Sequence, residues 1–140
     1  MYRLIFIFIP LFFVSCTKDI ALSEQDVNSK ITQFIELHFP GHTIIQAIKD
    51  RDFMYKSYDV WLSDNVKLEF NRKYEIIDIE SASKLPDSVI PAKILDYINM
   101  RYPQLFIKEW AKDDNRQEVE LNNELTLIFS KSGDFIRIDD

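Results

Sequence analysis

The chain has 140 residues, of which 46% are hydrophobic and 29% charged, the balance of an ordinary globular domain and not of a disordered or repetitive chain. Its formal net charge of −6 argues against binding to nucleic acid, which needs concentrated Lys and Arg. The single cysteine excludes a disulfide within the chain.

The N-terminal segment is typical of an export signal. Arg3 is followed by an apolar run over residues 4–14, which is shorter than the roughly 20 residues that a membrane-spanning helix needs. We therefore interpret residues 1–15 as a signal peptide.

The end of this segment, Ser15-Cys16, resembles the lipobox of bacterial lipoproteins, in which a small residue precedes the cysteine that is acylated. Under this interpretation Cys16 carries the lipid and residues 16–21 form a tether. We expect a protein of the cell envelope, anchored to the outer membrane and either periplasmic or exposed at the surface. The alternative is an ordinary cleaved secretory signal that leaves a free thiol.

Residues 22–84 predict one helix followed by four strands. Polar residues from Ser23 to Asp26 suit a helix start, and Ile31, Phe34 and Ile35 recur at helical spacing until Pro40 ends the pattern. Alternating apolar residues then predict strands over four ranges. These ranges are 43–50, 53–62, 66–71 and 74–80.

Residues 85–140 repeat this pattern. Counterparts in the helical region are 63 residues apart, as Ile31 and Ile94 are, and those in the later strands are 59 apart, as Phe70 and Phe129 are. Pro91 suits the first turn of the second helix. Strands are expected over 105–112, 116–121, 124–130 and 134–139, with Ile136 and Ile138 as core counterparts of Ile77 and Ile79.

Neither copy is large enough to be stable alone, so the two sheets should join edge to edge in one domain. We predict an α+β fold in which tandem duplicated units of one helix and four strands form a curved antiparallel sheet of about eight strands. Both helices should pack on one face and leave the other face open. We expect a monomer.

The repeated pattern resembles the PepSY-like family of bacterial lipoproteins, whose fold is similar to that of β-lactamase-inhibitor proteins. The resemblance rests on residues 94–98 with Tyr102-Pro103, on residues 119–121 and 127–133, and on the matching positions of the first copy. In the first copy Lys73-Tyr74 replaces Ser132-Gly133. It implies a non-enzymatic envelope protein that binds a protein or peptide, with enzyme inhibition as one form of that binding.

Strand alternation predicts which side chains lie on the open sheet face and could bind the partner. Trp61 and Trp110 would be the main anchors, because tryptophan offers a large contact area with a polar group. The alternative is that both pack across strands as structural residues. The predicted binding residues are Tyr55, Trp61, Lys67, Glu69, Lys108, Trp110 and Arg137.

The sequence offers little for catalysis or metal binding. Pro40 separates His38 from His42 and breaks the helix that would align them as a metal pair. No nucleophile motif or phosphate-binding loop is present, so we expect no catalytic residue, no metal and no cofactor. The other function that the sequence leaves open is an envelope scaffold or maintenance lipoprotein without a dedicated pocket.

Overall fold

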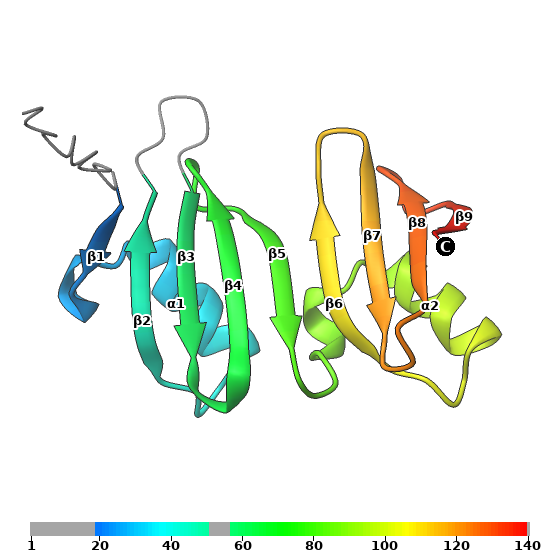
Figure 1. The fold of residues 1–140 in the computed structure, drawn as a ribbon, viewed down its shortest axis with the longest axis horizontal. Coiled ribbons are helices and arrows are strands. Elements are labelled where there is room, and N and C mark those ends of the chain that lie inside the picture. The colour runs from blue at the N-terminus through cyan, green and yellow to red at the C-terminus, as the bar shows by residue number, and fades with distance from the viewer. Residues whose placement is uncertain (1–18, 51–56, 140) are drawn as a thin grey trace, which may run out of the picture.

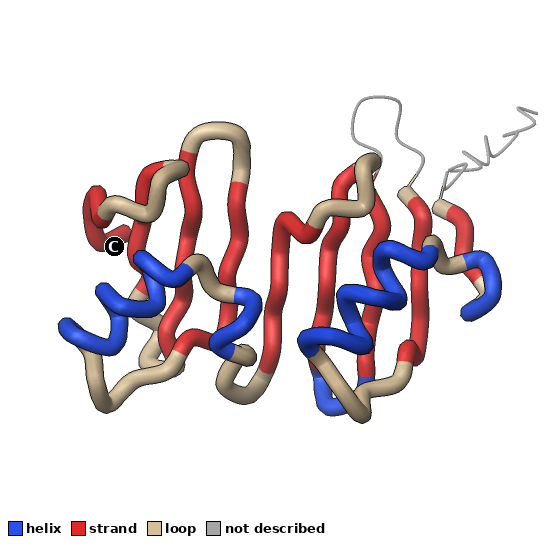
Figure 2. The backbone as a smooth tube through the Cα atoms, turned by 180° about the vertical axis from the view of Figure 1, so that it is seen from behind, coloured by secondary structure: helices blue, strands red, loops and turns tan. Residues whose placement is uncertain are grey.

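The computed structural model describes residues 19–50 and 57–139. These residues form one antiparallel sheet in which nine strands lie in chain order, and two α-helices cover one of its faces (Figure 1, Figure 2). The α+β class, the duplication and the placement of both helices on one face are confirmed. The sheet has one strand more than the eight expected.

The first copy contains a short initial strand, one α-helix and four further strands. They are β1 (Ile20–Leu22), α1 (Ser29–His38), β2 (Ile44–Lys49), β3 (Ser57–Leu62), β4 (Val66–Asn71) and β5 (Ile76–Ser81). The second copy has α2 (Ala92–Arg101), β6 (Ile107–Lys112), β7 (Arg116–Leu121), β8 (Thr126–Ser130) and β9 (Phe135–Asp139). No helix among the described residues is long and apolar enough to cross a membrane. The expected signal peptide and Cys16 lie outside these residues.

Strand β1 is the element that the sequence did not predict. It includes residues 20 and 21, which were expected to belong to the tether, and it pairs with β2 so that Leu22 lies opposite Ala47. In the second copy, β6 corresponds to β2 and Trp110 corresponds to Ala47. Strand β5 pairs with β6 as β1 pairs with β2, because Ile79 of β5 lies opposite Trp110. Strand β5 therefore closes the first copy and also supplies the first strand of the second.

Both helices begin later than the sequence indicated. The residues expected to start the first helix form a 3₁₀ turn, Glu24–Asp26, and α1 begins after Asn28, whose side chain accepts a hydrogen bond from the backbone N–H of Lys30. Val27 separates the two elements because it adopts an extended conformation. In the second copy Pro91 precedes α2 at the N-cap position, so it lies just before the first turn and not within it.

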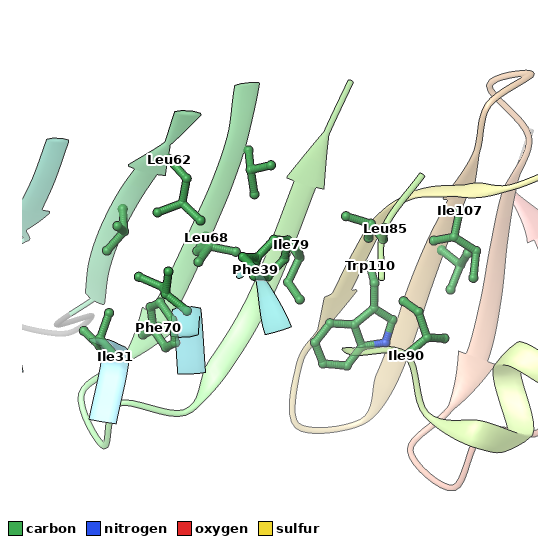
Figure 3. Packing of buried hydrophobic residues seen from close by; sticks show 14 of the residues in the cluster. Ile31, Phe39, Leu62, Leu68, Phe70, Ile79, Leu85, Ile90, Ile107 and Trp110 are labelled. Atoms are coloured by element: carbon green, nitrogen blue, oxygen red, sulfur yellow. The ribbon is translucent and has the colours of Figure 1, made fainter. Parts of the chain in front are cut away.

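The core lies between the helices and the sheet. Ile31 of α1 and Ile94 of α2 are fully buried there, and the edge of the Phe34 ring packs on Phe70, with centroids 5.4 Å apart. Tyr97 and Phe129 repeat this contact at the same distance. Figure 3 shows that the core continues across the junction of the two copies, where Trp110 lies between Ile79 and Ile90.

The two copies share their irregularities as well as their regular elements. Register shifts occur between Ile44 and Gln46 and at the equivalent place between Ile107 and Glu109. A second pair of shifts separates Glu69 from Phe70 and Ile128 from Phe129. Each such β-bulge adds a residue to one strand and so changes which residues after it face the core.

Three hairpins use the same turn, in which the fourth of five residues has a positive φ. Tyr74, Glu124 and Gly133 occupy this position with φ of 65°, 69° and 83°. The N–H of each donates to the carbonyl oxygen three residues earlier, on Asn71, Leu121 or Ser130. The replacement of glycine by Tyr74 in the first copy therefore leaves the turn unchanged, although a left-handed conformation is unfavourable for tyrosine.

We expect Glu124→Gly to raise the free energy of unfolding by about 0.5–1 kcal/mol, because glycine relieves the left-handed strain at an exposed position. Gly133→Ala at the equivalent position should lower it by about 1 kcal/mol or more, since a Cβ there would lie 3.3 Å from the Cβ of Lys93. Denaturant unfolding of both variants checks this. Two shifts of the same sign would contradict the shared turn.

Candidate binding face

The sheet face opposite the helices, called the open face below, carries two rows of side chains that cross the strands. One row contains Asp59, Glu69, Asp78, Ala111 and Glu118. The other contains Trp61, Lys67, Glu80, Glu109 and Glu120. We call the carboxylates of both rows the acidic band; it comprises Asp59, Glu69, Asp78, Glu80, Glu109, Glu118 and Glu120.

Several carboxylates of the acidic band lie directly opposite another carboxylate. Asp59 pairs with Glu69 in register, and Glu69 pairs in turn with Asp78. Glu109 lies between Glu80 on β5 and Glu120 on β7. Like charges directly opposite each other on neighbouring strands destabilise a sheet, so the band has an electrostatic cost.

The pKa values of the acidic band reflect this crowding. The pKa of Glu109 is raised from 4.5 to about 7, mainly by partial burial and to a smaller extent by the neighbouring negative charges of Asp78, Glu120 and Glu80. Burial also raises the pKa values of Asp59, Glu69 and Asp78, while the positive charge of Lys67 opposes each rise. At neutral pH Glu109 therefore carries only part of a negative charge.

Two lysines lie within or beside the band. The Nζ of Lys108 is 2.6 Å from Oε1 of Glu120, and the Nζ of Lys67 is 5.9 Å from the centroid of the Trp61 ring. An open hollow of about 400 Å³ lies beside Trp61 and is also lined by Ile45, whose side chain is exposed. An apolar anchor point therefore adjoins the acidic band.

The structure places most of the predicted binding residues on the open face. Trp61, Lys67, Glu69 and Lys108 lie on it, and Arg137 lies at its far end, opposite Ile128, where it forms an ion pair with Asp139. Tyr55 lies outside the described residues. The remaining residue, Trp110, is on the other side of the sheet.

The prediction that Trp110 lies on the open face is wrong. Its side chain is 3% exposed and belongs to the core, where Nε1 donates a hydrogen bond of 3.0 Å to Oε1 of Gln117. The β-bulge at Lys108 is the reason, because the extra residue turns Trp110 to the core face and Glu109 to the open face. Simple alternation therefore missed Glu109. Its only sequence signal was the charged pair Lys108-Glu109 between the apolar residues Ile107 and Trp110.

Ile136 and Ile138 were also expected in the core, and this is wrong. They are 54% and 41% exposed, whereas Ile79, the counterpart of Ile138, is fully buried. Strand β6 lies beside Ile79, but within the described chain no further strand lies beyond β9. Burial at this position thus depends on a neighbouring strand as well as on the residue itself.

The histidines do not form a pair. Nδ1 of His38 is 2.9 Å from Oγ of Ser88, whereas Nε2 of His42 is 3.6 Å from Oδ2 of Asp64. In the part of the chain that the structure describes, no group of three or more His, Cys, Asp or Glu residues is arranged to hold a metal ion.

Comparison with protein families gives a direct match. A family model described as "Putative beta-lactamase-inhibitor-like, PepSY-like" matches residues 14–78 and again residues 56–137. The chain belongs to the PepSY-like family. Its two matches agree with the duplication seen in the sheet and with the resemblance noted in the sequence.

Three solved structures similar to this PepSY-like chain come from Bacteroides. One is titled a "putative periplasmic protein from DUF2874 family" from Bacteroides vulgatus, with 28% identity, a TM-score of 0.83 and coverage of 89% of this chain and 99% of that one. Another, a "putative calcium-regulated periplasmic protein" from Bacteroides thetaiotaomicron, has 29% identity, a TM-score of 0.82 and coverage of 87% and 97%.

A third similar structure is titled a "putative periplasmic protein of unknown function" from Bacteroides vulgatus. It has 26% identity and a TM-score of 0.82, with coverage of 87% of this PepSY-like chain and 99% of that one. The search of curated proteins found no match. The three structures therefore share the duplicated fold, and their titles name no protein partner and no substrate.

The two tryptophans of this PepSY-like chain should respond differently to truncation. We expect Trp110→Ala to lower the free energy of unfolding by about 3–5 kcal/mol, because it leaves a cavity in the core and removes a partner of Gln117. Trp61→Ala should cost less than about 1 kcal/mol, since Trp61 lies on the open face. Equal losses in denaturant unfolding would contradict the assignment of Trp61 to the open face.

Glu109→Gln tests the charge crowding. The pKa of Glu109 is raised from 4.5 to about 7 in the folded state. The side chain therefore makes its full favourable contribution to the free energy of unfolding below pH 4.5, and this contribution is lost as the pH rises through about 7. We expect the variant to lose less stability over this range and to be more stable than wild type at pH 8, by about 1–2 kcal/mol after allowance for solvent screening.

Thermal unfolding between pH 4 and 8 measures this difference. Glu36→Gln on α1, which lies outside the acidic band, is the control and should leave the pH dependence as it is in wild type. A Glu109→Gln variant that loses as much stability as wild type between pH 4.5 and 7 would show that Glu109 has no role in the pH dependence.

Proposed function

We propose that this PepSY-like protein is a lipid-anchored, non-enzymatic protein of the bacterial cell envelope, and that its open face binds a cationic segment of a protein or peptide. The observation that carries the proposal is the acidic band, in which carboxylates face one another across neighbouring strands. A surface with this electrostatic cost is better explained by a partner that compensates it than by folding alone.

Lys or Arg side chains of a partner would compensate the band by lying between its carboxylates. A cation near Glu109 would favour the ionised form and lower the raised pKa of this residue. Binding would then release a proton and become tighter as the pH rises through about 7. Because the band is partly solvated, binding should also weaken at high salt.

Trp61 and the hollow beside it add an apolar contact to this electrostatic one. Trp61 adjoins the band through Lys67, which lies opposite Glu80. Aromatic anchors next to charged groups are common in protein interfaces. The partner segment should therefore combine cationic residues with at least one bulky apolar residue, spaced to meet the hollow and the band together.

The location rests on two supports. Ser15-Cys16 ends an apolar N-terminal segment in the manner of a lipoprotein signal. The three similar structures carry titles that call them periplasmic. The family description mentions inhibitors, so inhibition of an enzyme is one effect that binding could have. One title also mentions regulation by calcium, and Ca²⁺ at an acidic surface would compete with a cationic partner.

Photo-crosslinking of the full-length chain in a bacterial envelope tests the proposal. A benzophenone amino acid at position 61 should give a defined adduct with an envelope protein or peptide, and the same group at position 37, exposed on α1, should not. Glu80→Lys should reduce the adduct roughly tenfold, because it reverses a charge of the band. Glu36→Lys makes the same change of charge outside the band and should have no effect.

Glu80→Lys replaces the like-charge pair with Glu109 by an opposite pair, but it also places two lysines opposite each other at Lys67. Thermal unfolding of the variant should therefore show that the fold is retained before a lost adduct is attributed to the changed charge. Equal yields of adduct at positions 61 and 37, or a yield at position 61 that Glu80→Lys does not change, would count against the open face as a binding surface. Cys16→Ala tests the anchor separately, since it should release the protein from the membrane fraction while the adduct at position 61 persists.

A further inference from the structure

Strand β9 is an edge strand whose outer side is unpaired in the described part of the chain. Throughout residues 19–50 and 57–139, no strand pairs with the outer side of β9, and Phe135, Ile136 and Ile138 are 37%, 54% and 41% exposed. Sheet edges are commonly protected by being short or covered, by bulges or by charged side chains, and β9 has a bulge before Arg137 and charges at Arg137 and Asp139 but no cover among the described residues. The opposite edge strand, β1, has only three residues, whereas β9 has five.

The duplication indicates what this edge can accept. Asp78, Ile79 and Glu80 of β5 pair with β6. Their counterparts in β9, 59 residues later, are Arg137, Ile138 and Asp139. In β5 the neighbouring strand places Trp110 opposite Ile79, and Ile79 is fully buried. The same backbone edge in β9 is therefore able to receive an antiparallel strand with an apolar residue opposite Ile138.

We propose that this strand is β9 of a second copy of the chain, in place of the monomer expected from the sequence, so that two molecules form one continuous sheet about a two-fold axis at Ile138. In this register Arg137 of each copy lies opposite Asp139 of the other, and Ile138 lies opposite Ile138. Arg137 and Asp139 project from the open face, because they pair with Ile128 and Thr126 on β8, whereas Ile138 pairs with the buried Leu127. Apolar residues thus meet on the helix face and opposite charges meet on the open face.

The charges of β9 favour this register and favour a second copy of β9 as the pairing strand. A shift of two residues would place Arg137 opposite Arg137, and a shift of one residue would bring the two faces of the sheet out of alignment. Arg137 and Asp139 already form an ion pair within one chain, so dimerisation exchanges partners without leaving either charge alone. Pairing of β9 with β1 of another copy would be heterologous and would extend without closing, whereas the β9–β9 contact closes on two copies.

Disulfide crosslinking of the full-length chain in an oxidising bacterial envelope tests the dimer. Residues directly opposite each other on antiparallel strands have Cα atoms about 4.5–5.5 Å apart, which a disulfide can span. Ile138→Cys should therefore give a reducible species of twice the molecular mass. Met100→Cys, at an exposed position on α2, is the control and should remain monomeric.

Charge exchange distinguishes this dimer from random collision. Arg137→Asp, added to Ile138→Cys, should lower the crosslinked fraction roughly tenfold, because like charges replace both reciprocal pairs. The further exchange Asp139→Arg should restore it. The proposal is overturned if Ile138→Cys crosslinks no more than Met100→Cys, or if the adduct contains a different protein. It is also overturned if the charge substitutions leave the crosslinked fraction unchanged.

Discussion

The pairing of β5 with β6 is the contact on which the rest of the structure depends. Only three residue pairs form it, yet it joins the two copies into one sheet. On the helix face it places Ile79 against Trp110, and on the open face it places Glu80 against Glu109. The apolar contact stabilises the junction, and the charged contact makes the acidic band continuous at an electrostatic cost.

The two copies differ at one core position where their neighbouring strands also differ. Ala47 and Trp110 occupy equivalent core positions after equivalent bulges, but Ala47 faces the short β1 and Trp110 faces the longer β5. The larger side chain fills the space between the copies and hydrogen bonds to Gln117. The acidic band extends from β3 to β7 and takes its carboxylates from both copies. It is therefore continuous only because the β5–β6 pair joins the two copies.

The sequence predicted the periodic features and missed the local ones. Helical and strand spacing identified both helices and eight strands, and the repeat related Phe70 to Phe129 because both copies build the same core. Bulges are invisible to strict alternation, so Trp110 was assigned to the wrong face and Glu109 was overlooked. Strand β1 was missed because three residues are too few to show a period, and the exposure of Ile138 depends on a neighbour that sequence patterns do not reveal.

The strand order also has a consequence for how the chain folds. Every strand pairs with the next one along the chain, and short connections join most of these pairs. Two pairs are exceptions: a 21-residue stretch containing α1 lies between Leu22 of β1 and Ile44 of β2, and the β5–β6 pair is separated by a longer stretch of 25 residues containing α2, between Ser81 and Ile107. Closing a longer loop costs more chain entropy, so the hairpins on either side can form before this pair does. The union of the two copies is then the late event in folding, and a chain halted before it would expose the apolar sides of two half-sheets.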